Sequence, residues 1–222
     1  MSPTGSFLKT CAAGAIFIGL AGCSYFAKQI LAPQKDETKF YVLTPAADAP
    51  SSAPAAASPA SSGDFTLGLG PVKLPPYLDR PEVVTRTAPN RLDLSKTDRW
   101  GESLQTNFTS VMSRDLAAQI GTQQIVVFPW YNTIHVDLQV QIEVYRFETD
   151  SQGLAQLSAK WTVRDGDGKN ILYVAESNLS QSSKREDTAD EAAALSRTVG
   201  DLSKEIANMV GQLRARNGTH PS

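Results

Sequence analysis

Strict alternation of apolar and polar side chains runs through residues 136–144, Val-Asp-Leu-Gln-Val-Gln-Ile-Glu-Val. Successive side chains of a β-strand point to opposite faces of a sheet, so this pattern predicts a strand with one buried face and one solvated face. Strands of this kind are typical of antiparallel sheets. The alternation changes phase after Val144, where Tyr145 and Phe147 become the bulky pair, and this change predicts a β-bulge near Tyr145.

Two more strands are predicted downstream, and the three together form a meander. Residues 157–163 (Leu-Ser-Ala-Lys-Trp-Thr-Val) alternate in the same way. Residues 165–168 (Asp-Gly-Asp-Gly) are typical of a hairpin turn, and residues 171–179 form the predicted return strand.

Two helices are predicted from apolar residues that recur at three- and four-residue spacing. The first is expected between Asp98 as N-cap and Gly121 just past its end, and its apolar positions are Trp100, Leu104, Phe108, Val111, Met112, Leu116 and Ile120. The second is expected to start with a capping box of Thr188 and Glu191, and its apolar stripe is Ala192, Leu195, Val199, Leu202, Ile206, Met209 and Leu213. The stripe indicates a helix laid across the sheet, and a helix-to-helix seam in a homo-oligomer is the alternative.

Shorter strands are predicted outside the meander, at residues 40–43, 65–70, 82–86, 91–94 and 125–128. Pro71 and Pro129 are expected to end two of these strands, and the last strand is expected to be buried. We expect the strand at 40–43 to join the main sheet, because an apolar strand alone in water is unstable. The predicted fold class is α+β, with a mostly antiparallel sheet packed against two helices.

The N-terminus has the features of an export signal. Lys9 is the only charged residue before Cys23, and residues 11–22 are apolar or small. This stretch has the length of a signal peptide and is shorter than the about 20 apolar residues that span a bilayer. It ends in Leu-Ala-Gly-Cys, a pattern at which bacterial lipoproteins are cut and their cysteine is acylated. We therefore predict that residues 1–22 are removed and that Cys23 carries the lipid, whose acyl chains anchor the protein stably.

The mature chain, residues 23–222, is nearly neutral. The signal carries one lysine and no acid, so 20 basic and 23 acidic side chains leave a net charge of −3 on 200 residues. Such a chain has no basic field to gather phosphates, which excludes a nucleic-acid-binding role. With Cys11 removed and Cys23 acylated, no cysteine remains for a disulfide or a thiolate metal site. Ser24, where an aspartate would favour the inner membrane, points to the outer membrane.

The mature chain divides into a tether, a domain and a tail. Residues 23–38 form the predicted tether, which reaches roughly 50 Å when extended. Residues 39–216 form a single predicted domain, and residues 217–222 are a predicted frayed tail. Within the domain, residues 46–63 consist mostly of alanine, proline and serine. We expect this insertion to be disordered, because it cannot bury enough apolar surface to offset its ordering entropy.

Motifs for catalysis or cofactor binding are not recognisable. His135 at a strand start and His220 in the tail give no triad and no zinc site. Residues 165–176 have the length of a calcium loop, but Lys169 occupies a ligand position. Residues 68–71 lack the lysine and hydroxyl residue of a phosphate-binding loop. No cofactor and no metal are expected.

Carboxylates remain a possible source of acid–base chemistry, as in glycoside hydrolases. The available acids are Glu102, Asp115, Asp137 and Glu143. Each is explained more simply as part of the polar face of a helix or strand. A periplasmic carboxylate-based hydrolase is therefore kept only as an alternative.

The stretch Leu-Pro-Pro-Tyr-Leu-Asp-Arg-Pro at residues 74–81 is apolar and stiffened by proline. Stiff segments lose little entropy on binding, and aromatic residues are favoured at interfaces. The candidate partner contacts are Pro75, Pro76, Tyr77, Leu78 and Arg80. The alternative is a loop that packs only on its own domain.

Several short motifs occur in a recognisable order after the lipid-attachment cysteine. They are Phe-Tyr-Val-Leu at 40–43, Gly-Pro-Val at 70–72, the proline stretch at 74–81, Asn-Arg-Leu at 90–92 and Arg-Trp-Gly-Glu-Ser-Leu at 99–104. This order resembles the ABC-type transport auxiliary lipoproteins, the family of the paraquat-inducible C lipoprotein. The resemblance covers about residues 38–215.

The resemblance implies a non-enzymatic function in transport. It implies an outer-membrane lipoprotein, facing the periplasm, that works with ABC transporter subunits and a mammalian-cell-entry-type periplasmic protein. Such systems move phospholipid or other hydrophobic molecules between the inner and outer membranes. The protein is then a possible homo-oligomer, since some members of the family are thought to form rings. An outer-membrane assembly or structural lipoprotein is the main alternative.

Overall fold

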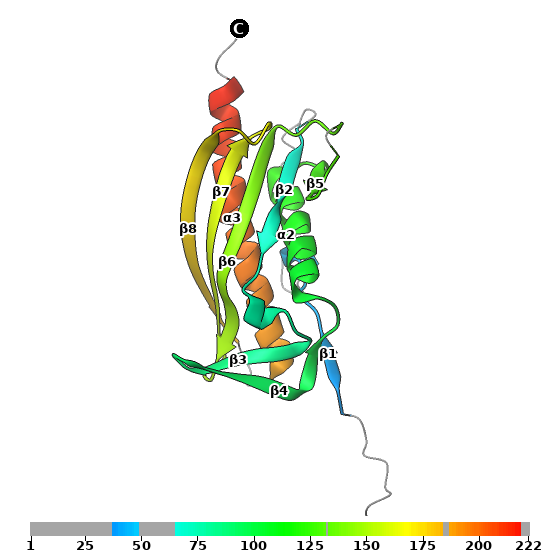
Figure 1. The fold of residues 1–222 in the computed structure, drawn as a ribbon, viewed down its shortest axis with the longest axis vertical. Helices are drawn as coiled ribbons and strands as arrows, with labels where there is room; N and C mark the ends of the chain where they lie inside the picture. Colours follow the sequence, from blue (N-terminus) through cyan, green and yellow to red (C-terminus); the bar gives the residue numbers. More distant parts are fainter. Residues whose placement is uncertain (1–36, 49–64, 132, 184–186, 219–222) are drawn as a thin grey trace, which may run out of the picture. The chain divides into compact units, whose positions relative to one another are not determined.

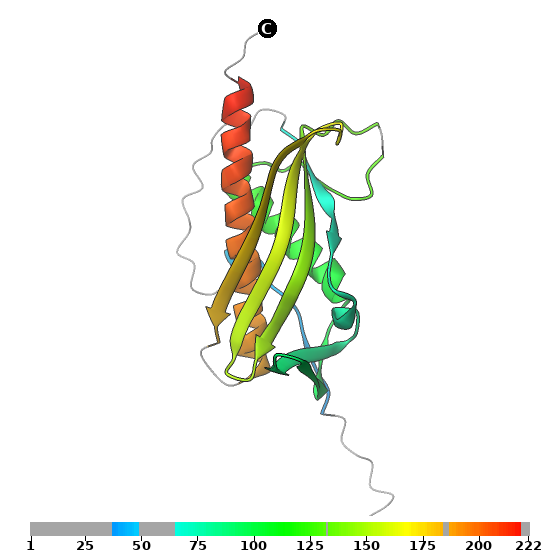
Figure 2. The same ribbon diagram turned by 60° about the vertical axis from the view of Figure 1, so that its left-hand side comes forward.

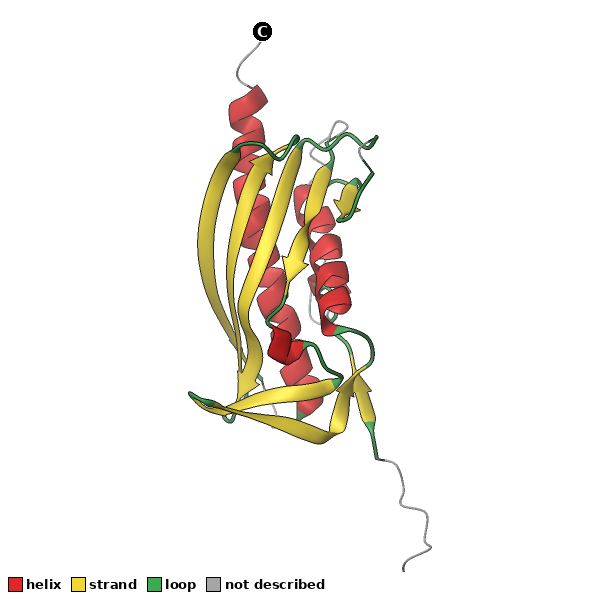
Figure 3. Ribbon diagram, viewed as in Figure 1, coloured by secondary structure: helices red, strands yellow, loops and turns green. Residues whose placement is uncertain are grey.

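The described part of the chain forms one eight-stranded sheet with two long helices packed against one face (Figure 1; Figure 3 shows the two layers in yellow and red). The computed structural model describes residues 37–48, 65–131, 133–183 and 187–218. The predicted signal peptide, Cys23, nearly all of the tether and most of the insertion lie outside these residues. The predicted α+β fold class is confirmed, with a mixed, mostly antiparallel sheet.

The meander predicted from the alternating segments is confirmed. It consists of β6 (Leu138–Asp150), β7 (Leu154–Asp165) and β8 (Ile171–Ser182), paired antiparallel. The register of β6 and β7 shifts between Val144 and Arg146, at the predicted bulge. Alternate side chains of β7 are buried beneath the helices because they face the core, and these are Ala155, Leu157, Ala159, Trp161 and Val163.

The other strands extend this sheet through parallel as well as antiparallel pairs. They are β1 (Lys39–Tyr41), β2 (Leu67–Lys73), β3 (Glu82–Ala88), β4 (Arg91–Trp100) and β5 (Ile125–Val127). The order along the sheet is β1-β4-β3-β6-β2-β5. Strand β6 lies parallel to both β2 and β3, whereas β3 and β4 form an antiparallel hairpin. Strand β1 pairs with β4, which confirms that the first strand joins the main sheet.

Two strand predictions were wrong. Pro71 lies inside β2, where the pairing with β6 shifts register between Leu69 and Val72. This irregularity tolerates proline because a residue at a bulge need not donate to the ladder. Strand β5 is a partly exposed edge strand, since it pairs only with β2 and its last residue, Val127, is 41% exposed.

The first helix, α2 (Leu104–Ile120), is shorter at its start than predicted. Asp98 lies in β4, where it accepts hydrogen bonds from Tyr41 Oη and Ser95 Oγ instead of capping the helix. Trp100 continues the helical spacing of the apolar residues but is buried from the end of β4, so the helix begins later than predicted. Gly121 is confirmed as the residue that ends the helix, with φ of 73°.

The second helix, α3 (Thr188–Gly218), lies across the sheet and against α2. Its cap differs from the predicted box: Asp187 Oδ1 accepts the N–H of Asp190 at 2.8 Å, while Glu191 accepts a hydrogen bond from Thr149. The apolar stripe is buried within the domain, apart from the partly buried Met209. The helix-to-helix seam is therefore not available to a second copy.

Residues 46–48, at the start of the predicted disordered insertion, are ordered. They form a 3₁₀ turn, η1 (Ala46–Asp48), that contacts α2 and α3. Asp115 Oδ1 accepts the N–H of Ala46 at 2.8 Å, and Arg114 pairs with Asp48 at 2.8 Å, so tertiary contacts replace the missing apolar burial. Among the described helices, none is both long and apolar enough to cross a membrane.

Candidate docking cleft

A cleft of about 660 Å³ lies between the proline stretch and the start of α2. We call it the Pro-Pro cleft, and its lining residues are Leu74, Pro75, Pro76, Leu78, Asp79, Arg80, Pro81, Trp100, Glu102, Ser103, Leu104 and Gln105. Two separate segments of the chain, residues 74–81 and 100–105, therefore form its walls. Both walls overlap sequence motifs, at residues 74–81 and 99–104.

The first wall is a tight turn fixed by its own backbone. Residues Pro76–Leu78 form the 3₁₀ turn η2, in which Leu78 N–H donates to Pro75 O at 3.0 Å. Leu78 is buried beneath the cleft, while Pro76 and Arg80 are exposed and Pro75 is half-buried. The turn therefore presents prolines and a guanidinium on a support that cannot easily rearrange.

The second wall is tied to the first wall and to the segment that follows β1. Trp100 N–H donates to Pro81 O at 2.7 Å, which joins the end of β4 to the end of the proline stretch. Behind this wall, in α2, Asn107 Nδ2 donates to Glu102 Oε1 at 2.8 Å, and Asn107 Oδ1 accepts the N–H of Leu43 at 2.5 Å. The cleft is thus held by backbone and buried amide contacts, so its shape exists before any ligand arrives.

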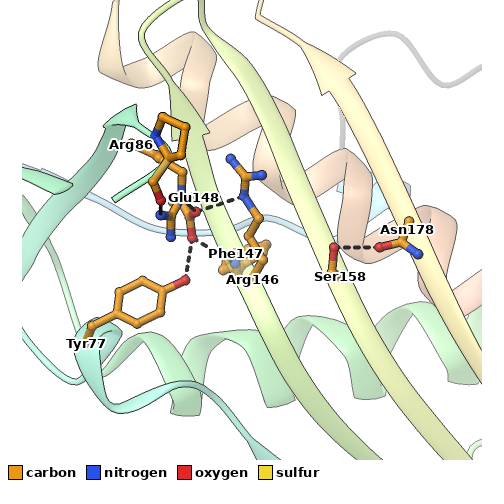
Figure 4. Close-up of polar contacts among 8 residues, drawn as sticks. Tyr77, Arg86, Arg146, Phe147, Glu148, Ser158 and Asn178 are labelled. Carbon is orange, nitrogen blue, oxygen red and sulfur yellow. Dashed lines mark hydrogen bonds and ion pairs between the residues drawn. The ribbon is translucent and has the colours of Figure 1, made fainter. Parts of the chain in front are cut away.

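Tyr77 faces away from this cleft and anchors the turn to β6 (Figure 4). Its hydroxyl donates to Glu148 Oε2 at 2.6 Å. Burial, and next the hydrogen bond to Glu148, raise the pKa of Tyr77 to about 12, so the hydroxyl keeps its proton. The Tyr77 side chain therefore packs on its own domain, as in the alternative interpretation of the proline stretch.

Glu148 is a buried carboxylate at the centre of a polar network (Figure 4). Besides Tyr77, its Oε1 accepts from Arg86 Nε at 2.6 Å and from Arg146 Nε at 2.9 Å, and its Oε2 accepts from Phe147 N–H at 3.2 Å. Two guanidiniums and two neutral donors compensate the loss of hydration. The network joins the proline turn, β3 and β6 into one support.

Residues 41–207 match the family described as the ABC-type transport auxiliary lipoprotein component. The chain belongs to this family. The match includes both walls of the Pro-Pro cleft and the network around Glu148. This auxiliary lipoprotein is therefore a component of an ABC-type transport system.

Solved structures support the fold of this auxiliary lipoprotein. A protein of Xanthomonas campestris shares 18% identity, with a TM-score of 0.59, and the similarity covers 80% of this chain and 99% of that one. A second structure, of an uncharacterized protein, has 15% identity and a TM-score of 0.62 over 78% of this chain and 98% of that one. At these identities the likeness shows the fold alone. None of the curated proteins matches the chain.

The four candidate acids of the hydrolase alternative have different surroundings in this auxiliary lipoprotein. Glu102 alone lines the Pro-Pro cleft. Asp115 is buried between α2 and η1, and burial raises its pKa to about 6. Asp137 accepts the N–H of Thr66, and Glu143 is exposed on the outer face of β6. No group of three His, Cys, Asp or Glu in the described ranges could hold a metal ion.

The turn that resembled a calcium loop is a hairpin turn between β7 and β8. Asp165 accepts from the N–H and the side-chain amide of Asn170, and the backbone N–H, as the largest cause, lowers the pKa of Asp165. Its carboxylate is therefore engaged in closing the turn. His135 is exposed and lies 3.3 Å from Asp137 Oδ1.

Sequence patterns missed Arg86, Arg146 and Glu148. Arg86 lies in a strand that shows no apolar alternation. Arg146 and Glu148 lie beyond the bulge, where the alternation no longer predicts which side chains are buried. The phase change after Val144 was the available signal. Cys23 lies outside the described residues, and its lipid attachment stays a prediction.

Proposed function

We propose that this protein is a lipid-anchored, non-enzymatic docking subunit of a transport system that moves phospholipid or other hydrophobic molecules between the inner and outer membranes. In this proposal Cys23 holds it on the outer membrane, and the tether lets the domain reach into the periplasm. The Pro-Pro cleft binds a segment of a mammalian-cell-entry-type periplasmic partner that works with the ABC transporter subunits.

The observation that carries this proposal is the rigidity of an exposed, mixed apolar and charged cleft. Pro76 and Arg80 are exposed at its rim, while the turn beneath them is fixed by Leu78 and Tyr77. A preformed site loses little conformational entropy on binding, and arginine is enriched in protein interfaces. Glu102 and Asp79 lie in the same cleft, so it offers both signs of charge to a partner.

Site-specific photo-crosslinking tests this docking role. We expect a photoreactive residue at position 76 or 80 of the lipidated protein to capture a mammalian-cell-entry-type protein or a permease subunit. A probe at Glu143, which is exposed on the outer sheet face, is the matched control. Capture of an outer-membrane channel alone would instead support the assembly or structural alternative, and equal capture from position 143 would refute the cleft as the docking site.

Charge reversal supplies the second measurement. Arg80→Glu should weaken co-purification of the partner without changing the melting temperature, because Arg80 is exposed. Arg91→Glu, an exposed arginine on β4, should leave co-purification unchanged. Membrane fractionation of Cys23→Ala, with mass spectrometry of the N-terminus, tests the anchor separately, because loss of the lipid should release the protein from the membrane.

A further inference from the structure

A second cleft, of about 490 Å³, lies on the other side of the Glu148 network. Its polar lining comes from Arg86 and Thr87 on β3, and from Arg146, Asp150, Ser151 and Gln152 on β6 and the following turn. We call it the arginine cleft. It shares no lining residue with the Pro-Pro cleft.

Both arginines are held in place by the same buried carboxylate oxygen (Figure 4). Arg86 Nε and Arg146 Nε donate to Glu148 Oε1 at 2.6 and 2.9 Å, and Arg86 Nη1 donates to Pro89 O at 3.0 Å. Arg86 also interacts with the side chain of Tyr77, whereas within the described ranges neither Nη atom of Arg146 has an acceptor. Both Nη atoms of Arg146 are therefore left for a ligand, and the side chains of Arg86 and Arg146 are 22% and 30% exposed.

The oriented guanidinium donors of this cluster, and not its net charge, favour an anion. Two guanidiniums share the single charge of Glu148, and Tyr77, the other side chain on that carboxylate, stays neutral. Asp150 also lines the cleft, so two arginines face two acids and the formal charges balance; Asp150 Oδ1 is directed to the turn, where it accepts the N–H groups of Gln152 and Leu154. An incoming anion therefore meets oriented donors whose rotamer freedom has already been lost.

We propose that Arg86 and Arg146 bind the phosphate group of an anionic ligand in the arginine cleft. Guanidinium forks match the oxygens of phosphate and give charge-assisted hydrogen bonds. Glu148 acts as the positioning residue, because it aligns both forks without contacting the ligand. Thr87 and Ser151 line the same cleft and carry hydroxyl groups that can donate to further phosphate oxygens.

The position of the cleft favours a membrane phospholipid as the source of this phosphate. The β3–β4 hairpin lies at the end of the domain where β1 begins (Figures 1 and 2). If Cys23 carries the lipid, as the proposed function holds, the 16 residues 23–38 can extend to at most roughly 50 Å, a length that allows this end to meet the headgroups. A free phosphate or phosphate monoester has the same chemistry and is the other source to be tested.

Calorimetric titration of the lipidated protein in neutral detergent tests the proposal. The two probes are inorganic phosphate and glycerophosphoglycerol, which is an anionic headgroup without acyl chains. Tighter binding of glycerophosphoglycerol supports a lipid headgroup, and tighter binding of inorganic phosphate supports a free phosphate. The absence of binding of both probes at millimolar concentration would overturn the proposal.

Variants separate the arginine cleft from general charge effects. Arg146→Gln should weaken the preferred probe about tenfold or more, because one charge-assisted contact is lost. Arg146→Lys, which keeps the charge and loses the fork, should have an intermediate effect. Arg91→Gln makes the same charge change at an exposed position of β4, which does not pair with β6, and should leave binding unchanged.

An equal loss in Arg91→Gln, or no loss in Arg146→Gln, would overturn the assignment. If Arg146→Gln lowers the melting temperature, the lysine variant decides, since it still offers a cation to Glu148. The proposed phosphate site uses no residue of the Pro-Pro cleft. Failure of the partner crosslinks at positions 76 and 80 therefore leaves it untouched, and its own failure leaves the docking proposal untouched.

Discussion

The two halves of strand β6 have opposite burial patterns. Before the bulge, Val140 and Ile142 are buried while Glu143 is exposed, as the alternation of the sequence predicts. After the bulge, three consecutive residues, Phe147, Glu148 and Thr149, are all buried. The first half has a solvated outer face, whereas the second half is covered by side chains on both faces.

The cause of this difference lies in other parts of the chain. Arg86 on β3 and Tyr77 in the proline turn reach Glu148 on the outer face, while Phe147 packs edge-to-face on Phe108 of α2. Contacts from distant segments can therefore bury a strand residue that the local alternation of apolar and polar residues does not predict to be buried. The comparison also separates two kinds of stabilisation, apolar packing on one face and a compensated charge on the other.

The largest effect is expected from Phe147→Ala. Phe147 is 1% exposed, and its removal leaves a cavity beside Phe108, so the free energy of unfolding should fall by about 3–5 kcal/mol. Urea unfolding followed by circular dichroism measures this loss. A change below about 1 kcal/mol would mean that the second half of β6 is not packed as described.

Glu148→Gln tests the opposite face of the same strand. The variant leaves Arg86 and Arg146 without their shared carboxylate, and we expect a loss of about 2–3 kcal/mol, lessened because both arginines are partly solvated. Glu143→Gln is the matched control in the exposed half and should change stability by less than about 0.5 kcal/mol. Equal effects in the two variants would remove the distinction between the halves.

Asp115 is a buried carboxylate without such compensation. Burial raises its pKa from 3.8 to about 6, although the Ala46 N–H and the charge of Arg114 oppose the shift, and no described group donates to Oδ2. Because the pKa of Asp115 is higher in the native state than in the unfolded state, protonation of Asp115 stabilises the fold. This contribution to the free energy of unfolding is complete below about pH 4 and is lost as the pH rises through about 6.

Asp115→Asn isolates this contribution from those of other acids. At pH 7.5 the variant should be more stable than the wild type by about 2 kcal/mol, and the difference should vanish near pH 4. Urea unfolding of both proteins across this pH range measures it. A stability difference that is independent of pH would contradict the raised pKa.

The smallest effect concerns the two helix starts. Asp187 Oδ1 caps α3 through the N–H of Asp190, so Asp187→Ala should cost about 1 kcal/mol. Ser103 precedes α2 without a side-chain capping bond, so Ser103→Ala should cost less than about 0.5 kcal/mol. Thermal unfolding of both variants measures the contrast, and a reversed order would show that the caps are misassigned.

Much of the fold could be predicted because its signals are local. The period-two alternation of β6 and β7, the Asp-Gly-Asp-Gly turn and the end of α2 at Gly121 each depend on a few neighbouring residues. The start of α2 could not be predicted, because Asp98 and Trp100 continue a helical spacing while lying in β4. The spacing of apolar residues cannot distinguish the first turn of a helix from the end of a preceding strand when the strand's residues fall at the same spacing.

The candidate sites show the same division. The sequence singled out residues 74–81 and 99–104, and the fold brings them together as the walls of one cleft. The sequence did not indicate the arginine cleft, because Arg86 and Arg146 lie on different strands and are 60 positions apart along the chain (146 − 86). A charged residue by itself does not reveal the partner that will bury it.

The sequence by itself determined the meander, the long helix and the membership of an auxiliary lipoprotein family, because periodicity and short motifs are properties of contiguous residues. Tertiary structure alone decided the parallel pairing of β6 with β2 and β3, the burial of Glu148 and the use of the α3 stripe inside the domain. These features depend on which distant segments meet, since burial and charge compensation are properties of contacts made in space.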